Sequence, residues 1–167
     1  MLALYLTIWF ALALFVAGET GRSFARRQSP PPAWAWWAFT FGLVLAIVHT
    51  LLSFDIVHNW VHDDAVRATA MQTEALFGVS VGWGVYVNYL FLGVWLADAW
   101  WWRASPHGYI RPAAITWSLR AFYMIILFNA AVIFAAGWRR LLGLALLSWL
   151  SRAWSAGISP SPSSRRR

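Results

Sequence analysis

A run of mostly apolar residues at positions 38–57 limits the fold more than any other feature of the sequence. At about 20 residues, it is long enough to cross a bilayer as one helix. Trp34, Trp36 and Trp37 precede it, and tryptophan is enriched where a membrane helix meets the headgroup region. Further apolar runs occupy 2–18, 78–97 and 121–138. We therefore predict an all-α polytopic membrane protein built as a bundle of four transmembrane helices.

The composition supports this class and excludes several others. With 60% hydrophobic and 11% charged residues among 167, the chain is too apolar for a soluble domain, and we expect one membrane domain over residues 1–158. There is no cysteine, which excludes disulfides, zinc-thiolate sites, iron-sulfur clusters and cysteine nucleophiles. The net charge of +7 comes from arginines scattered over short loops and a tail, so it indicates contact with lipid and not with nucleic acid.

The distribution of arginine predicts the orientation. Arg22, Arg26 and Arg27 follow the first apolar run, and no basic residue precedes it. Positive loops stay in the cytoplasm, so the N-terminus is expected to face outward. Without a basic segment before it, the first run is expected to be a retained anchor and not a cleaved signal peptide.

The C-terminal part of the chain allows two interpretations. Residues 141–158 are rich in leucine but carry a polar stripe at helical spacing. The stripe consists of Ser148, Ser151, Arg152 and Ser155. We expect an amphipathic helix that lies in the membrane interface, with a fifth span as the alternative, because an arginine inside a span is costly. The arginine count favours the fifth span, since four spans leave Arg139, Arg140 and the tail outside. The tail, 159–167, is predicted to be disordered.

The densest polar chemistry follows the second apolar run. Asp55, His58 and His62 are spaced i, i+3, i+7, which places them on one stripe of a continuous helix. Two neutral imidazoles and a carboxylate are suitable ligands for a divalent metal. The alternative is that these are polar side chains at the headgroup level. With 4 histidines in all, the chain lacks the ligands of a membrane desaturase.

A second polar set lies at mid-membrane depth. His49, Asn88 and Asn129 fall near the middles of three apolar runs, where lipid offers no hydrogen bonds. We expect them to form a buried polar layer that joins the helices, with a proton or ligand path as the alternative. A bis-histidine haem is disfavoured, because no other run contains a mid-membrane histidine. Near the inner face, Asp98 and Arg120 are expected to pair.

Glycine spacing suggests where helices pack. Gly78 and Gly82 lie four residues apart in the third apolar run and would leave one helix face nearly bare for a partner helix. The sequence contains no G-x-S-x-G, no phosphate-binding glycine loop, no H-E-x-x-H and no lysine. We therefore expect a non-enzymatic structural or partner-binding membrane component, a homo-oligomer or the subunit of another membrane assembly. The alternative is a metal-handling or redox membrane protein that uses the Asp/His/His stripe.

The central part of the chain resembles a group of small bacterial multi-pass membrane proteins to which no activity is assigned. The resemblance rests on His49, His58-Asn59-Trp60-Val61-His62, the stretch from Thr69 to Glu74, Tyr86-Val87-Asn88-Tyr89 and Val94-Trp95-Leu96-Ala97-Asp98-Ala99-Trp100-Trp101-Trp102. It covers roughly residues 34–138 and implies a bacterial inner-membrane setting. It carries no functional residue over to this chain.

Overall fold

The computed structural model describes residues 1–25 and 29–156. Most of these residues are helical, and none of them forms a β-strand. The all-α class predicted from the sequence is therefore confirmed. The helices are α1 (Leu2–Ser23), α2 (Ala33–Ile56), α3 (His62–Phe77), α4 (Gly84–Ala104), α5 (Ala113–Phe128) and α6 (Trp138–Ala156). A short π-helical segment, η1 (Asn129–Ile133), continues α5.

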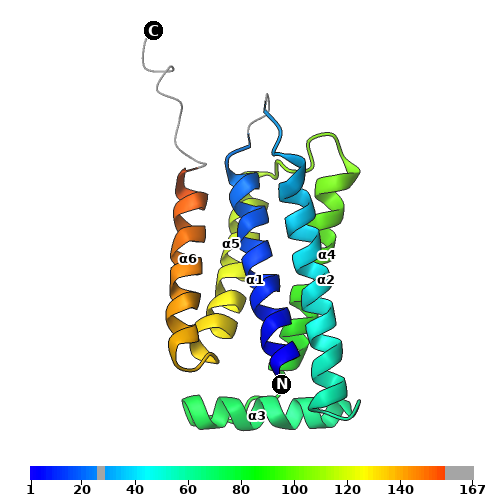
Figure 1. The fold of residues 1–167 in the computed structure, drawn as a ribbon, viewed down its shortest axis with the longest axis vertical. Coiled ribbons are helices and arrows are strands. Elements are labelled where there is room, and N and C mark those ends of the chain that lie inside the picture. The colour runs from blue at the N-terminus through cyan, green and yellow to red at the C-terminus, as the bar shows by residue number, and fades with distance from the viewer. Residues whose placement is uncertain (26–28, 157–167) are drawn as a thin grey trace.

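Five of these helices run side by side, and α3 lies across one end of the bundle (Figure 1). Helix α1 packs against α2 and α6, and α4 packs against α2 and α5. The N-terminus lies at the end that carries α3, which we call the α3 end. The loops 29–32 and 105–112 lie at the opposite end, which we call the loop end.

Three of the described helical segments are long and apolar enough to cross a membrane. They are Leu2–Ser23, Ala33–Ile56 and Ala113–Ile133, with mean hydropathies of 1.9, 1.9 and 1.5. Helices α4 and α6 run beside them in the bundle but are less apolar. The chain is thus a helical protein with three segments that could span a membrane, and three of the four predicted spans overlap them.

The C-terminal helix differs from the arrangement favoured by the sequence. Helix α6 packs on α1 and η1 and runs parallel to the bundle axis (Figure 1). A helix in the membrane interface would instead lie across the ends of the spans, as α3 does. The reason is the inward face of α6, where Leu147, Leu150 and Trp154 are buried. Residues 157–158 of the predicted helix and the predicted tail lie outside the described residues.

The chain breaks sharply between α2 and α3. Helix α2 ends at Ile56, and Asn59 and Trp60 adopt left-handed backbone conformations with φ of 47° and 61°. Helix α3 then begins at His62, with Asp63 and Asp64 in its first turn, where a carboxylate favours the helix dipole. The turn directs α3 across the bundle, so the linker expected between the second and third spans is itself a helix.

The third apolar run does not form one helix. Gly78 ends α3 in a left-handed conformation with φ of 71°, which glycine adopts without strain, and α4 begins only at Gly84. A Cβ on Gly82 would lie 2.7 Å from Cγ1 of Val66, so this glycine permits close contact with α3. The predicted packing face of Gly78 and Gly82 is therefore wrong, because the two residues do not share a helix.

The core is a cluster of aromatic rings from four helices. Phe15 of α1 lies at its centre, with ring centroids 5.4 Å from Phe39, 4.9 Å from Trp95 and 5.0 Å from Tyr123. All four side chains are almost fully buried. Such edge and tilted contacts between aromatic rings contribute beyond the area that they bury, so this cluster holds α1, α2, α4 and α5 in register.

Candidate functional site

Charged side chains are buried together in the half of the bundle nearer the loop end. Glu19 and Arg22 come from the last turns of α1, Asp98 from α4, and Arg111 from the loop before α5. Their side chains are between 0% and 3% exposed. Buried charges are tolerated only when they are paired and hydrogen-bonded, so the partners of each group decide what the cluster can do.

Asp98 is the acceptor at the centre of this network. It receives hydrogen bonds from Nη1 of Arg22 at 2.9 Å and from Nη1 of Arg111 at 2.6 Å. The hydroxyl of Tyr123 on α5 donates to the same carboxylate at 3.2 Å. Asp98, on α4, is therefore joined to α1, to α5 and to the loop between α4 and α5 through charge-assisted bonds.

Glu19 holds the same two arginines from the other side. Its carboxylate lies 3.5 Å from Nη1 of Arg22 and 3.4 Å from Nη2 of Arg111. The indole Nε1 of Trp154 on α6 donates to it at 2.9 Å. Asp98 thus accepts three hydrogen bonds, Glu19 accepts two and forms an ion pair with Arg22, and each arginine reaches both carboxylates.

Electrostatics favour the charged form of Arg111. Burial alone would lower the pKa of Arg111, but the Glu19 and Asp98 carboxylates raise it above its ordinary value. Both carboxylates are bonded to arginine and to tyrosine or tryptophan side chains and are at most 1% exposed, so a substrate has no access to them. This arrangement positions helices and loops, and it is poorly suited to proton transfer.

Arg120 of α5 is a third buried cation beside the network. Its guanidinium lies 5.6 Å from the ring centroid of Trp117 and 5.3 Å from that of Trp154, and its Nη1 donates to the Trp154 carbonyl at 3.4 Å. Its Nε is buried and has no hydrogen-bond partner among the residues that the structure describes. The predicted pair of Asp98 and Arg120 is wrong, because Arg22 and Arg111 occupy the Asp98 carboxylate.

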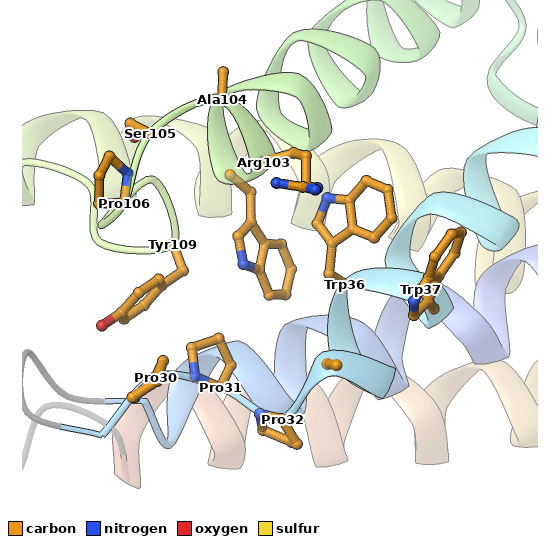
Figure 2. Close-up of a pocket in the computed structure, with 12 residues that line it drawn as sticks. Pro30, Pro31, Pro32, Trp36, Trp37, Arg103, Ala104, Ser105, Pro106 and Tyr109 are labelled. Atoms are coloured by element: carbon orange, nitrogen blue, oxygen red, sulfur yellow. The ribbon is translucent and has the colours of Figure 1, made fainter.

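A pocket of about 670 Å³ opens at the loop end, beside the network. Figure 2 shows its two sides, with Pro30, Pro31 and Pro32 facing Ser105 and Pro106 across it. Aromatic side chains from α2, α4 and the following loop also line it, together with Arg103. They are Trp36, Trp37, Trp102 and Tyr109. The pocket is therefore apolar and aromatic, with one arginine.

The buried network holds two walls of this loop-end pocket. Nε of Arg22 donates to the carbonyl of Tyr109 at 2.8 Å, and its Nη2 donates to that of Gly108 at 2.9 Å. The same guanidinium lies 4.7 Å from the ring centroid of Trp102. Since Trp102 and Tyr109 line the pocket, Arg22 links the shape of the pocket to the ion network.

The structure separates the residues of the predicted metal stripe. Asp55 lies in the last turn of α2, where it accepts a 3.0 Å bond from Nε1 of Trp60, and His58 lies in the turn after α2. His62 starts α3, and its ring nitrogens lie 3.1 Å and 3.4 Å from the hydroxyls of Tyr86 and Tyr89. The stripe is wrong because it assumes an unbroken helix. Within the described residues, no group of three histidine, aspartate or glutamate side chains is placed to hold a metal ion.

The structure also separates the three residues of the predicted mid-membrane layer. Nδ1 of His49 lies 3.0 Å from the carbonyl of Leu4 and 3.3 Å from Oγ1 of Thr7, so its partners belong to α1. Asn88 is exposed on α4, and Asn129 begins the π-helical segment η1. His49 does join two helices, as expected, but the three residues do not form one layer.

Sequence reasoning missed Glu19 and the roles of Arg22 and Arg111. These residues lie at the ends of apolar runs, where charges ordinarily serve as anchors in the headgroup region. One available signal was the i, i+3 spacing of Glu19 and Arg22, which places opposite charges on one helix face. A second was Asp98, an isolated acid within an apolar and aromatic segment.

Comparison with known proteins gives no relative for this chain: no family model, curated protein or solved structure matches it.

Proposed function

We propose that this chain is a non-enzymatic component of the inner membrane that binds a partner at its loop-end pocket. The observation that carries this proposal is the role of Arg22, which bonds to Asp98 and to the carbonyls of Gly108 and Tyr109. A buried ion network that fixes the walls of a pocket reduces the ordering cost of binding. In this proposal, the buried charged side chains hold the walls of the loop-end pocket in the shape that binds the partner.

The proposed topology has five spans, with the N-terminus outside. Helices α4 and α6 would cross the bilayer beside the three most apolar helices, and α3 would lie on the outer surface. Two observations support this arrangement. Helix α6 runs parallel to the bundle axis, and the loop end, which would face the cytoplasm, carries Arg22, Arg103 and Arg111. It also places the end of α6 on the cytoplasmic side.

The chemistry of the loop-end pocket suggests an acidic protein segment as the partner. Aromatic rings and prolines offer flat apolar contacts, and Arg103 is exposed, with no ion pair to the described residues. Aromatic residues and arginine are enriched where proteins bind one another. A cytoplasmic segment of another membrane subunit, or of a second copy, would reach the pocket from the membrane surface.

Site-specific photocrosslinking in membranes tests this function. A photoreactive amino acid at Trp37, which is 52% exposed at the loop-end pocket, should form a discrete adduct of protein size. The same amino acid at Leu90, which is 57% exposed on the outer face of α4, serves as the control and should contact lipid only. The adduct at Trp37 should disappear in Arg103→Glu.

Two results would refute the proposal. The first is the same adduct pattern from positions 37 and 90, because the pocket would then have no special partner. The second is an adduct at Trp37 that is unchanged in Arg103→Glu, because the acidic character of the partner would then be wrong.

A further inference from the structure

Helix α3 has two unlike faces along its length. Small and apolar residues recur on one side at the spacing of a single helix face. They are Ala65, Val66, Thr69, Ala70, Thr73, Leu76 and Phe77. The opposite side is exposed and mostly charged, with Asp63, Arg67, Met71 and Glu74. We call the first side the apolar face of α3.

The first part of the apolar face is covered by the segment that leads into α4. Ala65 is 3% exposed, and a Cβ on Gly82 would lie 2.7 Å from Cγ1 of Val66. The backbone N–H of Val81 donates a 2.8 Å hydrogen bond to Oγ1 of Thr73. The protein therefore covers this face from the start of α3 as far as Thr73.

The last turn of the apolar face is not covered. Leu76 and Phe77 continue the face but are 47% and 57% exposed. A Cβ on Gly84, the first residue of α4, would lie 3.1 Å from Cγ2 of Thr69, so α4 meets α3 near its middle. The last turn of α3 therefore extends past the helix that supports it.

His62 shows which way the apolar face is turned. It is the first residue of α3 and lies on the same side of the helix as this face. Its ring nitrogens lie 3.1 Å and 3.4 Å from the hydroxyls of Tyr86 and Tyr89, which follow the start of α4. From there α4 runs along the bundle toward the loop end (Figure 1). The face that carries Leu76 and Phe77 is thus turned toward the bundle.

Lipid would surround the bundle on the side of α3 to which this face is turned, because the bundle contains three segments that could span a membrane. Exposed tryptophans mark the α3 end: Trp60 precedes α3, Trp83 precedes α4 and Trp138 begins α6. Tryptophan is enriched where a membrane helix meets the headgroup region. An uncovered face that is turned from this level toward the bundle would meet the apolar part of the leaflet.

We propose that the last turn of α3 is a lipid anchor. Leu76 and Phe77 insert among the acyl chains of the leaflet at the α3 end, and the charged side of α3 stays in water. Amphipathic helices bind in the plane of the interface in this way. The proposal requires that the bundle axis crosses the bilayer, but it holds for either orientation and does not depend on the partner at the loop-end pocket.

Fluorescence quenching in the full-length chain, which has no native cysteine, tests the anchor. Phe77→Cys and Met71→Cys, each labelled with nitrobenzoxadiazole, place a probe on the two sides of α3 at positions 57% and 64% exposed. In phosphatidylcholine nanodiscs, lipid with a nitroxide near the headgroup should quench the probe at 77 about threefold more than the probe at 71, because only the former contacts acyl chains. Aqueous iodide should quench the two probes in the reverse order.

Two further variants keep the test informative. Leu76→Cys lies on the same face and replaces Phe77→Cys if that variant folds poorly, as judged by the thermal unfolding midpoint in detergent. Leu90→Cys, 57% exposed on the outer face of α4, reports separately whether the bundle itself lies in lipid.

Two results would overturn the anchor while the probe at 90 is quenched by lipid. The first is equal quenching of positions 71 and 77 by each quencher, because the apolar face would then lie in water. The second is protection of positions 76 and 77 from both quenchers, because protein, such as a second copy of the chain, would then cover the face. A probe at 90 that only iodide quenches would overturn both the anchor and the membrane-spanning bundle.

Discussion

The indole Nε1 of Trp154 donates a 2.9 Å hydrogen bond to the carboxylate of Glu19, across 135 positions of the sequence. This bond joins α6 to the last turns of α1 in the buried interior. Helix α6 is therefore held by a buried polar contact in addition to its leucines, and that contact belongs to the same network that fixes the loop-end pocket.

Removing this bond should destabilise the bundle. Trp154→Phe keeps an aromatic face for Arg120 but leaves Glu19 with one donor fewer, and we expect a loss of about 1–3 kcal/mol in the free energy of unfolding. Thermal unfolding in detergent measures the change. Trp138→Phe, at the start of α6 and 71% exposed, is the control and should change stability by less than about 0.5 kcal/mol. Equal losses in the two variants would contradict the structural role of Glu19.

Neutralising Asp98 should have a larger effect. Asp98→Asn leaves Arg22 and Arg111 buried with one carboxylate between them, and breaking a buried ion pair typically costs about 3–5 kcal/mol. Asp64→Asn breaks the exposed pair with Arg67 and should cost at most about 1 kcal/mol. Unfolding in detergent should rank the two variants in this order. A tolerated Asp98→Asn would mean that the network is not a stabilising element.

His49 allows a test that depends on which ring nitrogen is bonded. Because Nδ1 donates to the Leu4 carbonyl, His49→Asn places an amide nitrogen near the same position, whereas the amide of His49→Gln reaches further, toward the position of Nε2. We expect the asparagine variant to retain stability and the glutamine and leucine variants to lose about 0.6–1.7 kcal/mol, the scale of hydrogen bonds between membrane helices. If the glutamine variant is more stable than the asparagine variant, Nδ1 is not the donor.

Two glycines of the same region should respond differently to a large side chain. Gly82→Leu would press against Val66 of α3 and should cost about 1–3 kcal/mol through overpacking. Gly93→Leu meets open space, since a Cβ there has no neighbour within 4 Å, and it should be tolerated. Protease sensitivity of α3, compared between the two variants, would show that Gly82 docks α3. Equal sensitivity would contradict this docking.

Single cysteines can test the five-span topology, because the chain has no native cysteine. Ser29, Gln72 and Ser155 are exposed in the loop, in α3 and near the end of α6. In intact cells, an impermeant thiol reagent should label a cysteine at 72 and should leave those at 29 and 155 unlabelled until the membrane is opened. Labelling at 155 but not at 29 would return the chain to four spans.

The all-α class was predictable because hydrophobic runs of membrane length have few other solutions. The run at 38–57 forms most of α2, and the run at 2–18 forms most of α1. The extension of α1 to Ser23 was not predictable from hydropathy. Glu19 and Arg22 continue the helix because charged partners from α4 and the loop before α5 pair with them and Trp154 of α6 donates a hydrogen bond to Glu19. Those partners lie far away in the sequence.

The candidate sites were harder to predict, because they depend on backbone breaks. The spacing of Asp55, His58 and His62 suits a metal only on a continuous helix, and the left-handed conformations of Asn59 and Trp60 end that continuity. Neither residue is a glycine, so the break is marked only by Asn59, a residue type that adopts the left-handed conformation more readily than most. The loop-end pocket was equally hidden, since its two sides come from segments about seventy positions apart that only the fold brings together.

The placement of Glu19 and Arg22 near the end of the first helix has a consequence for biogenesis. The first helix leaves the ribosome long before Asp98, Arg111 and Trp154 have been synthesised, so during membrane insertion its two charges have only each other, at i, i+3 spacing. A lone helix that carries such a charged pair is released into lipid only at a cost in free energy. The nascent chain should therefore stay beside the insertion machinery until its last helix emerges, and a ribosome stalled before Trp154 would leave an intermediate exposed to membrane proteases.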